Sequence, residues 1–304
     1  MYDVLCAGLT DCDLIFSELS KFPVLGQEVS SKDFIIKPGG AANLPVALTK
    51  LGLKIIFSTT LGKDNLGKIV YEYLEETGMD MSAVQASEKF RTSVSAVLSV
   101  GYERGFASYF AKNDKIFIKD QIEKFAPSCN HIHAYIEDCL RIPIIEIAEK
   151  YNKTISVDTS WNENIKLVNI KDILRRANIF FTNEMEACSI TETKNVEDAL
   201  EKLSGYANFV VIKLGSSGSI IKKDNKIIRV PEVKNIKVVD TTGAGDLFCA
   251  GFIYGISKGW DIEKTAYFAS ASGGLAVTFY GGMDETYTIN NVNDYYQKVI
   301  QGVK

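Results

Sequence analysis

Short apolar segments alternate with amphipathic ones along most of the chain, and this alternation restricts the fold more than any other feature. Residues 55–62, 154–160 and 209–215 are rich in Val, Ile and Phe, which predicts strands buried on both faces. Residues 43–52 and 66–78 carry apolar side chains at helical spacing, and both end at glycine. The alternation therefore predicts an α/β fold, with a mainly parallel sheet covered by helices on both faces.

Composition excludes several classes of protein. The 304 residues are 46% hydrophobic and 24% charged, and the net charge is −4; this composition is typical of a globular chain. The slight acidity offers no basic surface for nucleic acid. No apolar run is long enough to cross a bilayer, and the first residues lack a basic leader segment. We expect a protein of the cytoplasm with no membrane or nucleic-acid partner.

Cysteine and histidine spacing gives no metal or redox framework. None of the six cysteines forms a Cys-x-x-Cys pair, so we expect buried thiols in a reducing compartment. The two histidines, His131 and His133, lie in a predicted strand without a nearby third ligand. We interpret both as structural residues.

Two stretches interrupt the alternation. Residues 14–37 contain a turn between strand-like flanks, and residues 91–112 alternate polar and apolar side chains around two glycines, as a hairpin does. These stretches predict a small β-sheet lid, although edge strands of the main sheet are the alternative. No linker is evident, so residues 1–304 are predicted to form one domain.

The segment 238–259 is the most informative about chemistry. Its pattern predicts a strand ending at Asp240, a Thr-Thr-Gly-Ala-Gly turn and a helix opening near Asp246. The amides of Ala244, Gly245 and Asp246 would point outward at the positive end of that helix, where they form an anion hole suited to a phosphoryl group. Asp246 could accept a proton from an attacking alcohol. The plainer interpretation is an N-cap after a tight turn.

Three other segments have polar residues at strand ends or before helices. Gly39 and Gly40 leave space beside Asn43, whose amide suits a sugar hydroxyl or simply caps a helix. Residues 180–187 end a strand with acidic residues that suit Mg²⁺ or merely begin a helix. Residues 211–219 form a small-residue turn that could pass a nucleotide or connect a hairpin.

Two nucleotide-binding signatures are absent. Residues 62–69 resemble a phosphate-binding P-loop, but Ile69 stands where Ser or Thr must ligate Mg²⁺. We therefore interpret this segment as an ordinary strand–helix turn. No segment completes Gly-x-Gly-x-x-Gly, which argues against a dinucleotide-dependent oxidoreductase.

Taken together, "GGAANLPVALTKLG" and "DTTGAGDLFCAGF" make the chain resemble the ribokinase-like (PfkB-type) carbohydrate kinases, in order and over essentially its whole length. The resemblance implies a three-layer ribokinase-like fold with a small β lid. It also implies an ATP-dependent kinase that uses Mg²⁺ and phosphorylates a hydroxyl group of a sugar or related compound.

The resemblance also assigns roles to residues that match the family motifs. Asp246 would be the catalytic base, beside an anion hole formed by Gly243, Ala244 and Gly245. The residues that would hold the sugar are Asp11, Asp13, Gly39, Gly40, Asn43 and Glu137. Those that would contact the nucleotide are Asn183, Lys213, Gly215, Gly218 and Ser270. Glu186 would bind Mg²⁺ through water.

Many members of the family bind K⁺ near the anion hole. The matching positions are Asp240, Thr242, Ala276, Phe279 and Gly281. Glu285 stands where a relative has Ser, which departs from that pattern.

The hydroxyl-directed set Asp13, Asn43 and Glu137 favours a ribose- or fructose-type monosaccharide with a primary hydroxyl group. Three alternatives stay open: a sugar-phosphate kinase, a nucleoside kinase and a catalytically silent sugar-binding regulator. The first would use the basic residues Lys37, Arg91 and Arg104, and the second would use the aromatic residues Phe106, Tyr109 and Phe110. An exposed edge of the lid would also allow a homodimer.

Overall fold

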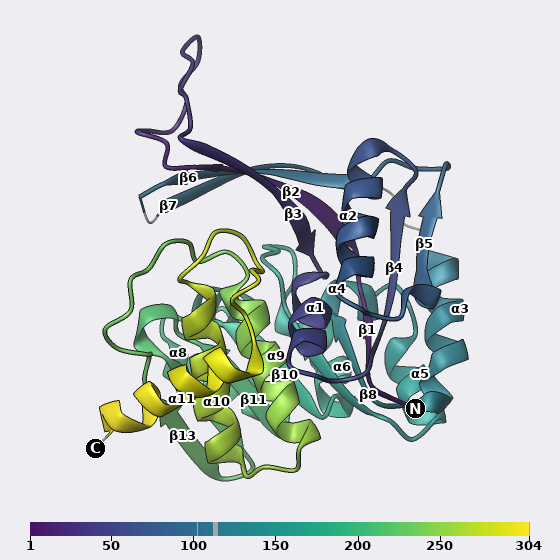
Figure 1. Ribbon diagram of the computed structural model, residues 1–304. Coiled ribbons are helices and arrows are strands. Elements are labelled where there is room, and N and C mark those ends of the chain that lie inside the picture. The colour runs from purple at the N-terminus through teal and green to yellow at the C-terminus, as the bar shows by residue number, and fades with distance from the viewer. Residues whose placement is uncertain (102, 112–114, 304) are drawn as a thin grey trace.

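The computed structural model describes residues 1–101, 103–111 and 115–303 (Figure 1). A nine-stranded sheet has the order β13-β12-β11-β10-β9-β8-β1-β4-β5. The seven strands from β11 to β5 run parallel, and β12 and β13 are antiparallel additions. In chain order the strands are β1 (Tyr2–Ala7), β4 (Ile55–Gly62), β5 (Val84–Ser87), β8 (Cys129–Tyr135), β9 (Thr154–Asp158), β10 (Ile179–Asn183), β11 (Phe209–Lys213), β12 (Ser219–Lys223) and β13 (Lys226–Val230).

Alternate side chains of the buried strands enter two hydrophobic cores, one on each face of the sheet. In β1, Val4 and Cys6 belong to one core, whereas Leu5 and Ala7 belong to the other. The first face is covered by α1 (Asn43–Lys50), α2 (Asn65–Glu76), α9 (Ala244–Ser257), α10 (Ile262–Ala276) and α11 (Ile289–Val303). The second is covered by α3 (Lys115–Phe125), α4 (Ile136–Cys139), α5 (Ile144–Lys150), α6 (Leu167–Arg176), α7 (Glu184–Thr191) and α8 (Val196–Ser204). The predicted three-layer arrangement is confirmed.

A second sheet has the order β3-β2-β6-β7. Its strands are β2 (Thr10–Ser17), β3 (Asp33–Gly40), β6 (Ser93–Val100) and β7 (Glu103–Tyr109). Figure 1 shows this sheet lying across the edge of the large sheet at which the parallel strands end. The sequence correctly predicts a separate sheet, but β2 begins before residue 14 and β3 extends past residue 37. Residues 102 and 112 of the predicted lid lie outside the described residues.

One strand prediction is wrong. Residues 231–243 form no strand, although the sequence predicts one ending at Asp240. The Val238–Val239 pair favours a strand locally, but the Val239 amide donates to the carbonyl oxygen of Val277 at 2.7 Å, just after α10. An extended loop therefore leads into α9.

Across the described part of the chain, no helix has the length and apolar character needed to cross a membrane. The two histidines lie in β8, in agreement with the predicted strand. Both ring nitrogens of His131 lie 2.8 Å from side-chain hydroxyls, those of Thr154 and Ser156 on β9. Such hydrogen bonds satisfy a buried imidazole without a metal.

The P-loop-like segment is a strand–helix turn, as predicted. Gly62 ends β4, and Asp64 caps α2 by accepting a hydrogen bond from the Gly67 amide at 2.9 Å. A Cβ atom on Gly67 would overlap the carbonyl oxygen of Gly62 and approach the Thr92 hydroxyl to 2.5 Å. Glycine at 67 is therefore needed for packing between helix and strand rather than for contact with phosphate.

We expect Gly67→Ala to lower the free energy of unfolding by about 1–3 kcal/mol, because the added methyl group overpacks the turn. Lys68→Ala should change neither the stability nor the KM for ATP, because the Lys68 side chain is exposed and its one ion pair among the described residues is with Glu72 at 3.6 Å. Thermal denaturation and steady-state kinetics measure both effects. A rise of tenfold or more in the KM for ATP in Lys68→Ala would revive the P-loop interpretation.

Candidate active site

Asp246 lies in the first turn of α9, where three elements meet. Asn43 Nδ2, at the start of α1, donates to Asp246 Oδ2 at 3.1 Å. The Tyr135 hydroxyl, at the end of β8, donates to Asp246 Oδ1 at 3.1 Å. Both carboxylate oxygens are thus held in place, and a lone pair on each remains available.

Burial raises the pKa of Asp246 to about 6, against the opposing effects of the Lys213 charge and the two hydrogen bonds. A carboxyl group with this pKa is mostly ionised at neutral pH and is a stronger base than an ordinary aspartate. Tyr135 was missed in the sequence analysis. The available signal was a polar side chain at the carboxyl end of a predicted parallel strand, where ligands bind.

The start of α9 requires glycine. Gly243 has φ +71°, and a Cβ atom there would overlap the Cα atom of Gly282. No side chain among the described residues caps the helix, and the amides of Gly245 and Asp246 have no acceptor within α9. The expectation that three amides point outward is only partly met, because the Ala244 amide donates to the Thr241 carbonyl oxygen at 3.3 Å.

A buried ion pair lies beneath this helix terminus. Lys213 Nζ, at the end of β11, donates to both carboxylate oxygens of Asp158 at 3.1 and 2.9 Å. Burial alone would lower the pKa of Lys213, but the charges of Asp158 and its neighbours raise it. A Cβ atom on Gly245 would lie 3.5 Å from Lys213 Nζ. Lys213 therefore adds positive charge at the start of α9, and Asp158 is a second residue that the sequence analysis missed.

Asn183 and Glu186 form a capping box at the start of α7. Asn183 Oδ1 accepts from the Glu186 amide at 2.9 Å, and Glu186 Oε2 accepts from the Asn183 amide at 3.1 Å and the Thr159 hydroxyl at 2.6 Å. The plainer interpretation of these residues, a helix start, is therefore realised. No hydrogen bond engages Glu186 Oε1 within the described residues, so this oxygen can accept a water of hydrated Mg²⁺.

A direct protein cage for a metal ion is not evident in the ranges that the structure describes, because no three His, Cys, Asp or Glu side chains converge on one point. The donor set at Glu186 thus fits a hydrated Mg²⁺, which keeps several of its waters, better than a fully ligated ion.

The other residues predicted to contact nucleotide surround the β11–β12 turn. Gly215 has φ +57°, and Gly218 has φ +84° with its Cα facing the Val230 carbonyl oxygen, which a Cβ atom would overlap. The Ser270 hydroxyl donates to the Pro231 carbonyl oxygen at 2.7 Å. Gly218 and Ser270 thus have structural roles, and nucleotide contact by these residues stays a prediction.

The residues predicted to hold the sugar come from the second sheet, from the start of α1 and from α4. Asp11 and Asp13 lie on β2, opposite Gly39 and Lys37 of β3. Glu137 Oε1 accepts from the Ser160 hydroxyl at 2.9 Å, and its Oε2 is buried without a hydrogen-bond partner among the described residues. An unpartnered buried oxygen is costly unless a ligand or water satisfies it.

The predicted K⁺ positions are bridged by hydrogen bonds. Asp240 accepts from the Thr242 amide at 3.0 Å, the Thr242 hydroxyl at 2.8 Å and the Gly281 amide at 2.9 Å. Arg104, on β7, donates to the Thr242 hydroxyl at 2.8 Å and lies 3.9 Å from Asp240. A guanidinium group thus already balances Asp240, and K⁺ binding stays a prediction.

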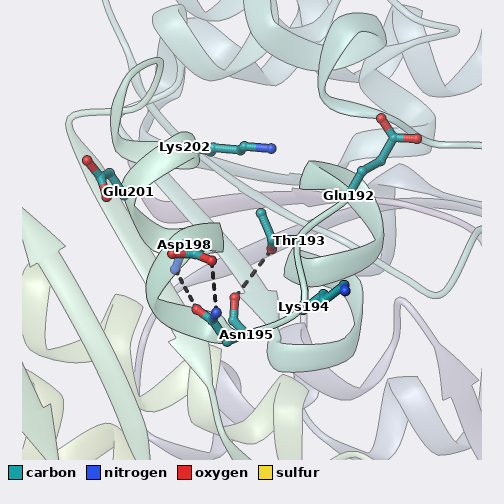
Figure 2. Close-up of a pocket in the computed structure, with 7 residues that line it drawn as sticks. All are labelled: Glu192, Thr193, Lys194, Asn195, Asp198, Glu201 and Lys202. Carbon is teal, nitrogen blue, oxygen red and sulfur yellow. Dashed lines mark hydrogen bonds between the residues drawn. The ribbon is translucent and has the colours of Figure 1, made fainter.

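A surface groove of about 550 Å³ lies between the end of α7 and the start of α8. Figure 2 shows hydrogen bonds that join Asn195 to Asp198 and Thr193 to Asn195. Asn195 Nδ2 donates to Asp198 Oδ2 at 2.8 Å, and Asn195 Oδ1 accepts from the Asp198 amide at 2.9 Å. These bonds cap α8, and the groove lies at the opposite end of α7 from Asn183 and Glu186. We do not place the site there.

Comparisons with known proteins identify similar sequences and folds. A family model described as pfkB family carbohydrate kinase matches residues 1–288. A 5-dehydro-2-deoxygluconokinase from Clostridium tetani is 26% identical over 86% of this chain and 84% of its own length. A nucleoside kinase from Methanocaldococcus jannaschii is 25% identical over 98% of both chains.

Solved structures share the fold. Arabidopsis thaliana ribokinase, complexed with ribose and ATP, has a TM-score of 0.84 and 23% identity, and the match covers 97% of this chain and 99% of that one. A putative ribokinase II from E. coli, in complex with ATP and Mg²⁺, has a TM-score of 0.83 and 21% identity, covering 98% of this chain and 100% of that one.

The two glycines at the start of α9 should respond differently to substitution. Gly243→Ala should lower the free energy of unfolding by at least about 1–2 kcal/mol, because alanine is strained at positive φ. Gly245→Ala should melt close to the wild type, since its new methyl group meets Lys213 at an ordinary contact distance. Thermal denaturation compares them, and equal melting temperatures for Gly243→Ala and wild type would contradict this account of the helix start.

Proposed function

The chain belongs to the pfkB family of carbohydrate kinases, and from that premise we propose that it transfers the γ-phosphoryl group of ATP to a hydroxyl group of a ribose- or fructose-type monosaccharide. Family membership makes it a phosphotransferase that acts on a sugar or nucleoside. One observation carries the proposed phosphoryl transfer to a hydroxyl group: Asn43 and Tyr135 hold the Asp246 carboxylate in the first turn of α9, where no side-chain cap is described.

Each group at this helix start has a role in the proposed reaction. ATP with Mg²⁺ supplies the phosphoryl group and offsets its negative charge. Asp246 accepts the proton of the acceptor hydroxyl, while the amides of Gly245 and Asp246 and the charge of Lys213 stabilise the anionic group. Glu186, through its free Oε1, would hold Mg²⁺ by way of water.

The second sheet supports the proposal as a lid. Arg104 reaches from β7 to Thr242 and so connects this sheet to the loop that precedes α9. A closed sheet over the site would exclude water, which competes with the sugar as phosphoryl acceptor.

A nucleoside acceptor is the second candidate, and Phe106 favours it. Strand alternation places Phe106 on the same face of β7 as Arg104, and its side chain is 58% exposed. Tyr109 lies on the other face of β7, so Phe106, Tyr109 and Phe110 do not form one surface on which a base could stack. A panel of pentoses, hexoses and nucleosides, assayed for ADP formation, discriminates between the two candidates.

Asp246→Asn should lower kcat for acceptor-dependent ADP formation by about 10²–10⁴-fold, because asparagine cannot accept the proton. Glu263→Gln is the matched control, because Glu263 is an exposed acidic residue in the first turn of α10. That variant should retain wild-type kcat. A wild-type protein that binds a sugar but never consumes ATP would refute the proposed activity and favour the silent regulator.

The pH profile should report the ionisation of Asp246. Since the ionised carboxylate is the base, kcat/KM for the acceptor should fall as pH drops below about 6, the pKa to which burial raises this group. Tyr135→Phe removes a hydrogen bond that lowers this pKa, so the acidic limb should move to higher pH. Tyr206→Phe, on the other face of the sheet, is the control. An unmoved limb in Tyr135→Phe would contradict the assignment.

A further inference from the structure

Two carboxyl groups of the proposed acceptor pocket lie side by side. Asp11 and Asp13 project from the same face of β2 and flank Gly39 on β3. The Oδ1 atoms of both lie 2.5 Å from the position that a Cβ atom on Gly39 would occupy. Only glycine at position 39 leaves room for the pair.

Asp11 is held from one side only. Its Oδ2 accepts from the Ser95 hydroxyl at 2.9 Å, and Ser95 lies 2.9 Å from the hydroxyl of Ser108. Its Oδ1 is buried and has no hydrogen-bond partner in the part of the chain that the structure describes, and Asp11 as a whole is only 7% exposed. Burial raises the pKa of Asp11, and burial together with the Asp11 charge raises the pKa of Asp13 to about 8.

The nearest basic residue on the same strand pair does not offset this charge. Lys37 is paired with Asp13 in the β2–β3 register. Its Nζ donates to the carbonyl oxygens of Tyr280 and Met283 and lies 3.7 Å from Asp284. Lys37 is therefore committed to the loop that follows α10.

A second basic side chain near the site is also committed, because Arg104 is bonded to Thr242 and paired with Asp240. An acceptor carrying a phosphate or carboxylate would thus face the Asp11–Asp13 pair without a free cation from these residues. Because the pKa of Asp13 is raised to about 8, the pair carries fewer than two negative charges at neutral pH. A single negative charge still repels an anion strongly where little water screens it.

We propose that Asp11 determines acceptor specificity: its carboxyl group, beside Asp13, makes the pocket select uncharged hydroxyl compounds and reject those that carry a phosphate or carboxylate. The inference rests on the proposed function and names the acceptor class. Asp11 acts on the acceptor through its charge and through Asp13, so it is a positioning residue rather than a catalytic one.

Asp11→Asn tests the proposal, because asparagine keeps the shape of aspartate and removes its charge. The acceptors are matched pairs, fructose with fructose 6-phosphate and ribose with ribonate, and kcat/KM is measured by ADP formation. We expect the wild type to prefer the neutral member of each usable pair by at least tenfold. Asp11→Asn should reduce that preference about tenfold, chiefly by lowering the KM for the anionic acceptor of each pair. The KM for ATP should stay unchanged.

Asp33→Asn is the matched control. Asp33 is exposed at the other end of β3, and its substitution changes the net charge by the same amount as Asp11→Asn. It should keep the wild-type preference. If Asp11→Asn fails to fold, Ser95→Ala provides a second test, because it removes the hydrogen bond that favours ionised Asp11. That variant should narrow the preference in the same direction by a smaller factor.

Calorimetric binding of the same acceptors separates this inference from the proposed activity. A protein that binds fructose or ribose without forming ADP contradicts the proposed activity, yet its preference for the neutral acceptor still tests the role of Asp11. Equal or tighter use of the anionic acceptors by the wild type would overturn the inference. An unchanged preference in a folded Asp11→Asn variant would overturn it as well, and so would the failure of both neutral acceptors to bind.

Discussion

The start of α9 is the constraint on which the candidate site depends. Gly243 adopts a left-handed conformation against Gly282, and this turn aims the first amides of the helix away from its own carbonyl groups. In the part of the chain that the structure describes, no side chain caps those amides, so the helix terminus keeps a partial positive charge. The Lys213–Asp158 ion pair beneath it adds a buried ammonium group. A residue with a side chain at 243 would rotate the turn and move Asp246 away from Asn43 and Tyr135.

The second sheet is part of the site rather than a cover added to it. β1 of the large sheet leads through Gly8 and Leu9 directly into β2. This short connection fixes the distance of Asp11 and Asp13 from the end of β1. Arg104 makes a further contact, from β7 to Thr242. Relative movement of the two sheets would therefore change the distance between the Asp11–Asp13 pair and Asp246, and it would break the Arg104 contact at the same time.

The sequence predicts those features that depend on residues close together in the chain. Buried strands are recognisable from runs of Val, Ile and Phe, and Asp246 from the glycine-rich turn before it. Tyr135 and Asp158 could not be assigned in this way, because their roles follow from contacts with Asp246 and Lys213, which lie far from them in the sequence. The hydrogen bond between Asn43 and Asp246 joins residues 203 positions apart. The wrong prediction of a strand before Asp240 has the same cause. Residues 238 and 239 favour a strand locally, but the Val239 amide donates to the carbonyl oxygen of Val277, which lies after α10.

Positive and negative groups lie on opposite sides of the site, and this separation supports the proposed positions of the phosphoryl donor and the acceptor. The helix terminus, Lys213 and the free oxygen of Glu186 lie where a polyanionic donor and its hydrated cation would be stabilised. The second sheet contributes carboxyl groups, and Arg104 is already paired. Asp246 lies between the two regions and is bonded to groups from α1 and β8. We therefore expect an anion on the helix side to meet positive charge and an anion on the carboxyl side to be repelled. The field that would hold the donor in one orientation would thus favour an acceptor without charge.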